Sequence, residues 1–182
     1  MKDMWKPLAI SLWLAGTGAW ACPSPPDHSA ALDALLTQVQ AAESETEGRL
    51  ITNRMWELWA TAPDDAAQAV LDSGLRKRAS YDFLGALAEF DKLVDYCPDY
   101  AEGYNQRAFV NFIRQDYAVA LEDLDRALDL SPRHVAAMAG KALTLMGLGR
   151  MYEGQQVLKQ ALALNPWLPE RRMVLPPPGK DL

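Results

Sequence analysis

A regular internal repeat is the feature that most restricts how this chain can fold. Pro98, Pro132 and Pro166 are equally spaced along the sequence. Proline ends a helix because it lacks the amide hydrogen that the helix needs. A period of about 34 residues is typical of stacked structural units, each of which needs its neighbours to bury its apolar side. Aligned on the prolines, the repeating segments are residues 67–100, 101–134 and 135–168.

Small and large side chains recur at fixed places in these segments. The residues 24 and 12 positions before the prolines are all small: Gly74, Ala108, Ala142, Ala86, Ala120 and Gly154. Eight positions before them stand the bulkier Phe90, Leu124 and Leu158. Small residues let two helices approach closely, and large ones fill the space beside the contact. The pattern predicts an all-α fold in which each segment forms a pair of helices.

These recurring residues resemble those of the tetratricopeptide repeat, a helix–turn–helix unit with the same period. Gly154 and Leu93 depart from the alanine usual at their places, and the aromatic residue usual near the start of a repeat is present only as Tyr104. The resemblance covers residues 67–168. It implies a helical solenoid of antiparallel helix pairs in which the first helix of each pair lines a concave groove.

A further helical pair is expected before the repeats. Ser29 is a good N-cap, and the run from Ser44 to Glu47 has the capping-box pattern that starts a helix. The pair ends at Pro63, which is one residue out of phase with the prolines of the repeats. We therefore expect residues 29–63 to form a degenerate pair that caps the first repeat. Residues 169–182 should be a short tail, with at most a short helix and disorder from residue 175.

The N-terminus has the pattern of a signal peptide. Lys2 and Lys6 precede the apolar run Leu8–Ala15, and small residues at Ala19 and Ala21 mark a cleavage site. The apolar run is too short to cross a bilayer, which takes about 20 residues. We expect residues 1–21 to be removed and residues 22–28 to be a flexible linker. The mature protein is then exported to the periplasm or secreted, without a transmembrane segment.

Cleavage would leave Cys22 at the mature N-terminus, with Cys97 as the other cysteine. Three states remain open from the sequence. Lipidation of Cys22 would anchor the protein to a membrane, although Ala19 and Trp20 fit a lipidation signal poorly. An oxidising compartment would permit a disulfide to Cys97, and Cys97 could equally be a buried thiol.

The resemblance places partner-binding residues along the groove. They are Leu71, Leu75, Asn105, Phe109, Phe112, Ile113, Leu143 and Met146. Such an apolar surface suits a peptide or an amphipathic helix, with Asn105 bonding its backbone. The alternative is that these side chains pack on one another or on the N-terminal pair. Chaperone-binding members of the family hold a carboxylate with basic residues, but the matching places here are Leu71, Leu75, Gln106, Ala136 and Gly140, so no such clamp is expected.

Composition and motifs disfavour other functions. The net charge of −6 opposes binding to nucleic acid or to anionic lipid. His28 and His134 form no metal-spaced cluster with other ligands, so we expect no metal, no cofactor and no enzymatic activity. We expect a protein-interaction module, an adaptor or scaffold that holds a protein or peptide. A lipid-anchored or self-associating membrane scaffold is the alternative, with the open C-terminal end of the repeats joining copies.

Overall fold

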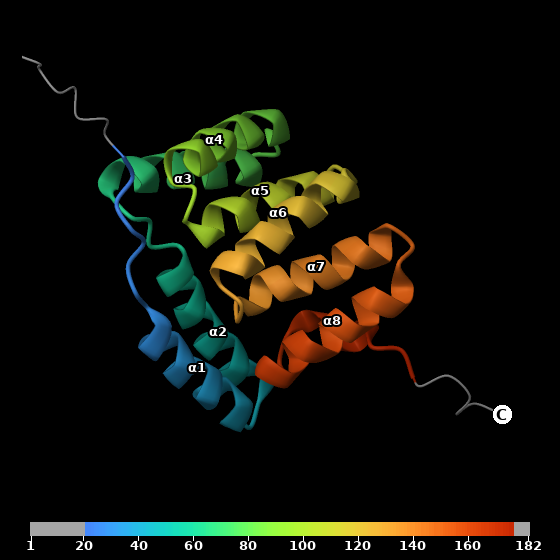
Figure 1. The fold of residues 1–182 in the computed structure, drawn as a ribbon. Coiled ribbons are helices and arrows are strands. Elements are labelled where there is room, and N and C mark those ends of the chain that lie inside the picture. Colours follow the sequence, from blue (N-terminus) through green and yellow to red (C-terminus); the bar gives the residue numbers. More distant parts are fainter. Residues whose placement is uncertain (1–20, 177–182) are drawn as a thin grey trace, which may run out of the picture.

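The computed structural model describes residues 21–176, and within them it is entirely helical. The elements are α1 (Ser29–Ala41), α2 (Glu45–Trp59), α3 (Asp65–Ala79), α4 (Phe83–Tyr96), α5 (Ala101–Ile113), α6 (Tyr117–Leu130), α7 (Val135–Gly147), α8 (Met151–Leu164) and the short 3-10 helix η1 (Pro169–Met173). The predicted all-α fold of antiparallel helix pairs is confirmed (Figure 1). The expected signal peptide and the end of the expected disordered tail lie outside the described residues.

Helices α3 to α8 pair in sequence order and stack into a curved array. The small residues mark the points where paired helices touch. A Cβ added to Gly154 would lie 2.7 Å from the backbone oxygen of Ala142, and one added to Gly74 would overlap the ring of Phe90. Ala86 and Ala120 are fully buried. The periodic recurrence of small residues is therefore a steric requirement of close helix packing.

The turn inside each pair also repeats. Tyr81, Gln115 and Gly149 adopt positive φ angles of 64°, 67° and 76°, and each occupies the same place in its own repeat. Gly149 enters this left-handed region without a steric penalty, whereas Tyr81 and Gln115 carry the cost of a Cβ there. The three turns share one backbone conformation despite their different residues, so neighbouring helix pairs keep the same geometry.

Local capping explains where the first two helices begin. The Ser44 hydroxyl accepts a hydrogen bond from the Glu47 amide at 3.2 Å, as the capping pattern predicts. The Glu47 carboxylate in turn accepts from the Glu43 amide at 3.0 Å. Ser29 is not the cap of α1: His28 holds that position, and Ser29 is the first helical residue. The Ser29 amide donates a hydrogen bond to the Asp27 carboxylate at 2.9 Å. The helix therefore begins at Ser29, one residue before the start that a Ser29 cap would give.

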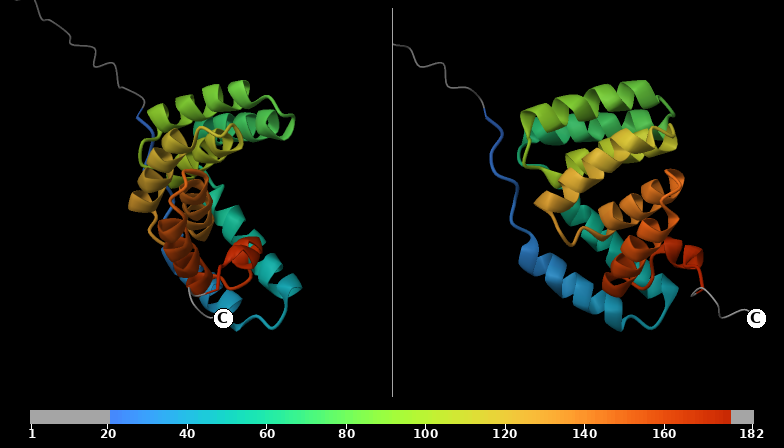
Figure 2. Two further views of the ribbon diagram at one scale, coloured as in Figure 1. Left: turned by 90° about the vertical axis from the view of Figure 1, so that its right-hand side faces the viewer. Right: turned by 45° about the vertical axis from the view of Figure 1, so that its right-hand side comes forward.

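The N-terminal pair α1–α2, which we call the hairpin, does not cap the first repeat. In the left view of Figure 2, α2 lies inside the curve formed by α3 to α8. Met55 and Trp59 of α2 share a buried cluster with Val135 at the start of α7, and Trp167 packs on the same cluster. The expected cap is corrected because the face of α2 that carries Met55 and Trp59 packs on the start of α7, across the array, instead of extending the array beyond α3.

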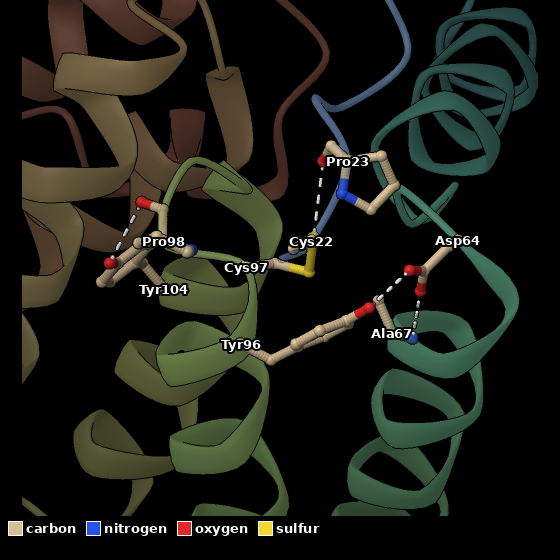
Figure 3. Close-up of a disulfide and its surroundings, with 8 residues drawn as sticks. All are labelled: Cys22, Pro23, Asp64, Ala67, Tyr96, Cys97, Pro98 and Tyr104. Carbon is tan, nitrogen blue, oxygen red and sulfur yellow. Dashed lines mark hydrogen bonds between the residues drawn. A yellow bond between two sulfur atoms is a disulfide. The ribbon is translucent and has the colours of Figure 1, made fainter. Parts of the chain in front are cut away.

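Both ends of the described chain are fastened. Cys22 and Cys97 form a disulfide that joins the segment before α1 to the end of α4 (Figure 3). At the other end, the side chain of Gln155 donates to the Met173 carbonyl at 2.8 Å and accepts from the Leu175 amide at 2.9 Å. These bonds hold η1, the short helix expected after residue 168, near α8. Among the described residues, no helix combines the length and the apolar character needed to span a bilayer.

Candidate functional site

The hairpin and the concave side of the array enclose a cavity of about 570 Å³. One wall is the face of α2 that carries Arg49, Thr52, Asn53 and Trp56. The opposite wall comes from α3, α5 and α7, and includes Leu75, Arg78, Asn105, Phe109, Phe112, Ala139, Leu143 and Thr144. Trp167, Leu168 and Glu170 close one side. Cavities of this volume are typical of sites for small molecules or short peptide segments.

The wall formed by α5 and α7 is mainly apolar. Phe109 remains 47% exposed although it is a large hydrophobic residue. Phe112 is half-buried, because one side of its ring packs on Tyr117 at 5.5 Å between centroids. Leu143 and Ala139 continue the surface on the next pair. An apolar ligand surface placed here would bury area that both partners otherwise expose to water.

Arg78 brings a positive charge to this wall. Its guanidinium lies 4.9 Å from the centre of the Phe109 ring and bonds to the side-chain oxygen of Gln106. Burial lowers the pKa of Arg78, and the nearby Glu102 carboxylate opposes that shift. Arg78 forms no ion pair within residues 21–176. The stacking on Phe109 therefore presents a cation at an aromatic surface without a paired carboxylate.

The floor of the cavity holds a buried polar network around Glu102, which is 1% exposed. Its carboxylate accepts from Asn105 at 3.0 Å and from Gln106. His134 Nδ1 accepts from the Ala137 amide, so its Nε2 carries the proton and donates to Glu102 at 2.9 Å. The side-chain NH2 group of Asn105 thus donates to Glu102 within the floor. From the sequence, Asn105 had been expected to bond the backbone of a partner.

Three buried polar atoms in the cavity lining have no hydrogen-bond partner among the described residues. They are Thr144 Oγ1, Trp167 Nε1 and Glu170 Oε2. A buried polar atom without a partner costs about 1–3 kcal/mol. The indole nitrogen can only donate and an ionised carboxylate can only accept. All three atoms are closed to solvent in this structure, so a ligand with a donor and an acceptor, such as a peptide group, would reach them only if the surrounding side chains moved.

The structure brings five of the predicted groove residues together in the cavity lining: Leu75, Asn105, Phe109, Phe112 and Leu143. Leu71 is not a groove residue, because it is fully buried in the cluster that contains Phe90 and Val110. Ile113 and Met146 do not line the cavity, and Met146 lies against Gly154 instead. Met146 thus contributes to packing between α7 and α8, whereas Ile113 is exposed at the end of α5.

The wall that α2 contributes was not predicted from the sequence. Arg49 and Trp56 were not assigned to the site because the hairpin was expected at the end of the array. One signal was present: Trp56 lies outside the stripe of Ile51, Met55 and Trp59, so α2 carries apolar side chains on two faces. A helix with two such faces packs on more than one neighbour.

Other candidate chemistry is absent from the described part of the chain. No group of three or more His, Cys, Asp or Glu residues is placed to hold a metal ion there. The buried carboxylate of α6, Asp123, is bonded by Arg107 at 2.9 and 2.6 Å. Arg126, on the same helix, donates to the Pro98 carbonyl at 3.1 Å and lies 3.5 Å from the carboxylate of Asp99.

Comparison with known proteins identifies the type of repeat. Residues 112–173 match the family model described as tetratricopeptide repeat. A tetratricopeptide repeat protein 36 homolog of Nematostella vectensis is 46% identical over 66 residues, which is 36% of each chain. A TPR repeat-containing protein of Rhizobium etli is 28% identical over 124 residues, covering 65% of this chain and 58% of that protein. The chain thus spans less than two thirds of either relative.

Solved structures share the fold. The second TPR domain of human RPAP3, in complex with an HSP70 peptide, superposes with a TM-score of 0.57 at 21% identity, over 60% of this chain and 91% of that domain. The MamA protein gives a TM-score of 0.52 at 17% identity, over 80% of this chain and 79% of that chain. The chain therefore shares the fold of these structures, contains a tetratricopeptide-repeat match over residues 112–173, and is similar in sequence to tetratricopeptide repeat protein 36 and to bacterial proteins with the same repeats.

Proposed function

We propose that the protein is a non-catalytic interaction module that holds a short extended segment of another polypeptide between α2 and the concave side of the array. The observation that carries this proposal is the cavity itself. It joins an apolar wall at Phe109 and Phe112 to a side formed by Trp167 and Glu170, where a buried donor and a buried acceptor lack partners among the described residues. Apolar side chains of a peptide match the wall, and its backbone groups match the polar atoms.

The volume favours an extended segment over a helix. A helix with its side chains is about 10–12 Å wide, so little more than one turn of it would fill a cavity of about 570 Å³. An extended strand is narrower and exposes its N–H and C=O groups along its length. Arg78 favours a segment with an acidic group near the Phe109 end, because a half-buried cation outside any ion pair of the described residues gains from a counter-charge. The similar RPAP3 domain, solved with an HSP70 peptide, shows that an array of this fold can hold a peptide.

A library of short peptides with blocked ends tests the proposal. The wild-type protein should enrich peptides that carry apolar residues. The change Phe109→Ala should lower the affinity for these peptides at least tenfold. Leu84→Ala is the matched control, because Leu84 is 71% exposed and lies on α4 outside the cavity. Equal binding by the two variants would place the site elsewhere. Failure of the wild-type protein to enrich any sequence would refute peptide binding in the cavity.

We further propose that the protein acts outside the cytosol, in the periplasm or as a secreted protein. The Cys22–Cys97 disulfide supports this, since such bonds persist in oxidising compartments. The same bond uses the sulfur that a lipid at Cys22 would need, so the structure gives no support to the lipid-anchored alternative. The intact mass of native material tests both points: we expect a chain that starts at Cys22, without a lipid and two hydrogens lighter than the dithiol.

A further inference from the structure

The contact between the hairpin and the repeats is the least satisfied part of the described structure. Five buried polar side-chain atoms lack a partner among residues 21–176, and they belong to His28, Trp59, Thr144, Trp167 and Glu170. The last three line the cavity beneath α2. The first two line a second cavity of about 300 Å³, between the start of α1 and the array. Within the described residues, the lack of hydrogen bonds is therefore confined to this one interface.

The two ends of the hairpin are held differently. At the end next to α3, the Trp59 ring stacks on His134 at 4.1 Å, and the Tyr100 hydroxyl donates to the Trp59 carbonyl at 2.7 Å. All three residues are buried. This end, which we call the pivot, is packed as a protein core is.

The far end of the hairpin, which we call the tip, is held by exposed contacts together with the packing of Trp167 against Gly48 and the hydrogen bond from Asn165 to Thr52. Glu45 pairs with Arg171 at 2.6 Å, and the Gln40 side chain donates to the carbonyls of Ala163 and Leu164 at 3.2 and 3.3 Å. The backbones of α1 and α2 approach each other closely but stay apart from the repeat helices. Exposed ion pairs contribute little to stability, so opening the tip breaks mainly the contacts of Trp167 and Asn165 with α2, whereas opening the pivot would expose the stacked Trp59 and His134.

Two covalent connections enter the hairpin at its pivot. One is the chain itself, residues 60–64, which leads into α3. The other is the linker of residues 22–28, which the disulfide fastens to Cys97 at the end of α4 (Figure 3). With both in place, the hairpin is tethered at two points near its pivot, and its movement is more restricted than with one. Without the disulfide, it is attached at one point and can swivel.

We propose that the hairpin is a lid that opens at its tip to admit a ligand to the cavity, and that the Cys22–Cys97 disulfide restricts its movement. This inference rests on the proposed function, because a lid implies a site beneath it. On closing, α2 places Arg49 and Trp56 on the outer side of the bound segment. Reduction by a dithiol breaks the S–S bond, gives two thiols with the uptake of two electrons and two protons, and leaves the reductant as a disulfide. The lid is then released from its second attachment.

Hydrogen–deuterium exchange of the full chain without ligand tests the lid directly. We expect Glu45→Arg, which faces Arg171 with a like charge, to speed exchange in residues 29–59 at least fivefold. The double variant Glu45→Arg/Arg171→Glu restores the ion pair and should restore slow exchange. Glu153→Arg is the control, because Glu153 pairs with Arg150 on α8, outside the cavity lining. Exchange in α5 and α6 should stay unchanged in all three variants.

Reduction supplies the second part of the test. Treatment of the wild-type protein with dithiothreitol, or the change Cys22→Ser, should speed exchange in residues 29–59 beyond the effect of Glu45→Arg. Unchanged exchange in both experiments, or a uniform change over all helices, would overturn the lid. A mobile hairpin in a protein that enriches no peptide would refute the proposed function and leave the lid intact. If peptides bind and neither Glu45→Arg nor reduction changes their association rate, the proposed function stands and the lid is refuted.

Discussion

The change Ala120→Leu tests whether close packing of α5 on α6 requires a small residue at this repeat position. Ala120 is fully buried in a cluster with Ala108, Leu124, Ala127 and Ala137, at the contact between α5 and α6. Leucine adds three carbon atoms, and none of the surrounding surface is open to solvent. Overpacking of this kind costs about 1–3 kcal/mol, because side chains or a helix must move. We therefore expect Ala120→Leu to lower the free energy of unfolding by that amount.

Ala118→Leu is the matched control. Ala118 lies on the same helix, two residues earlier, and is exposed. Alanine and leucine have similar helix propensities, so the change there should stay within about 0.5 kcal/mol. Thermal melts of the oxidised variants, followed by far-ultraviolet circular dichroism, give the readout. At about 2–4 °C per kcal/mol for a chain of this size, Ala120→Leu should lose roughly 2–12 °C. Equal melting temperatures for the two variants would refute the assignment of Ala120 to a close helix contact.

Three further predictions address the disulfide, a helix cap and a second close contact. Replacing Cys22 and Cys97 by serine opens a loop of 75 residues, which should cost about 4 kcal/mol in urea unfolding; a loss below about 1 kcal/mol would contradict a formed disulfide. The Asp64 carboxylate accepts from a backbone amide and a tyrosine hydroxyl, which lowers its pKa; its stabilisation is therefore present above about pH 4 and is lost as the pH falls through the lowered pKa, so the difference in melting temperature between wild type and Asp64→Ala should narrow towards pH 2. Gly154→Ala should destabilise the protein, because the new Cβ meets the Ala142 carbonyl; a higher melting temperature, as helix propensity alone predicts, would count against that contact.

The repeat array could be predicted because its determinants are local. Each helix pair is specified by small residues such as Gly74 and Ala108 and by a proline at its end, all within a single repeat. The structure buries Gly74 against Phe90 of the same pair. A steric rule that acts at short range leaves a periodic trace in the sequence. The helices could therefore be derived without knowing how the chain closes.

The candidate site was only half predictable because its second wall depends on distant partners. Thr52 of α2 accepts a hydrogen bond from Asn165 at 2.9 Å, across 113 residues of sequence. No spacing rule connects these positions. Trp167 packs where a Cβ at Gly48 would stand. This contact joins two single residues, so no sequence pattern predicts it either. The wall on α5 was found from the repeat register, whereas Leu71 was misplaced because burial at a groove position depends on the neighbouring helices.

The position of the hairpin also constrains the order in which the protein folds. The bonds of its tip join residues near position 40 to the last helix, with Gln40 reaching Leu164 over 124 residues. Each repeat pair closes a much shorter loop, and contacts between distant segments form more slowly than local ones. The first helices to be synthesised must therefore wait for α7 before Trp59 can stack on His134, and for α8 before the bonds of the tip can form. Trp56 and Trp59 are exposed for that interval, which makes the nascent hairpin the part of the chain most prone to aggregation or chaperone capture.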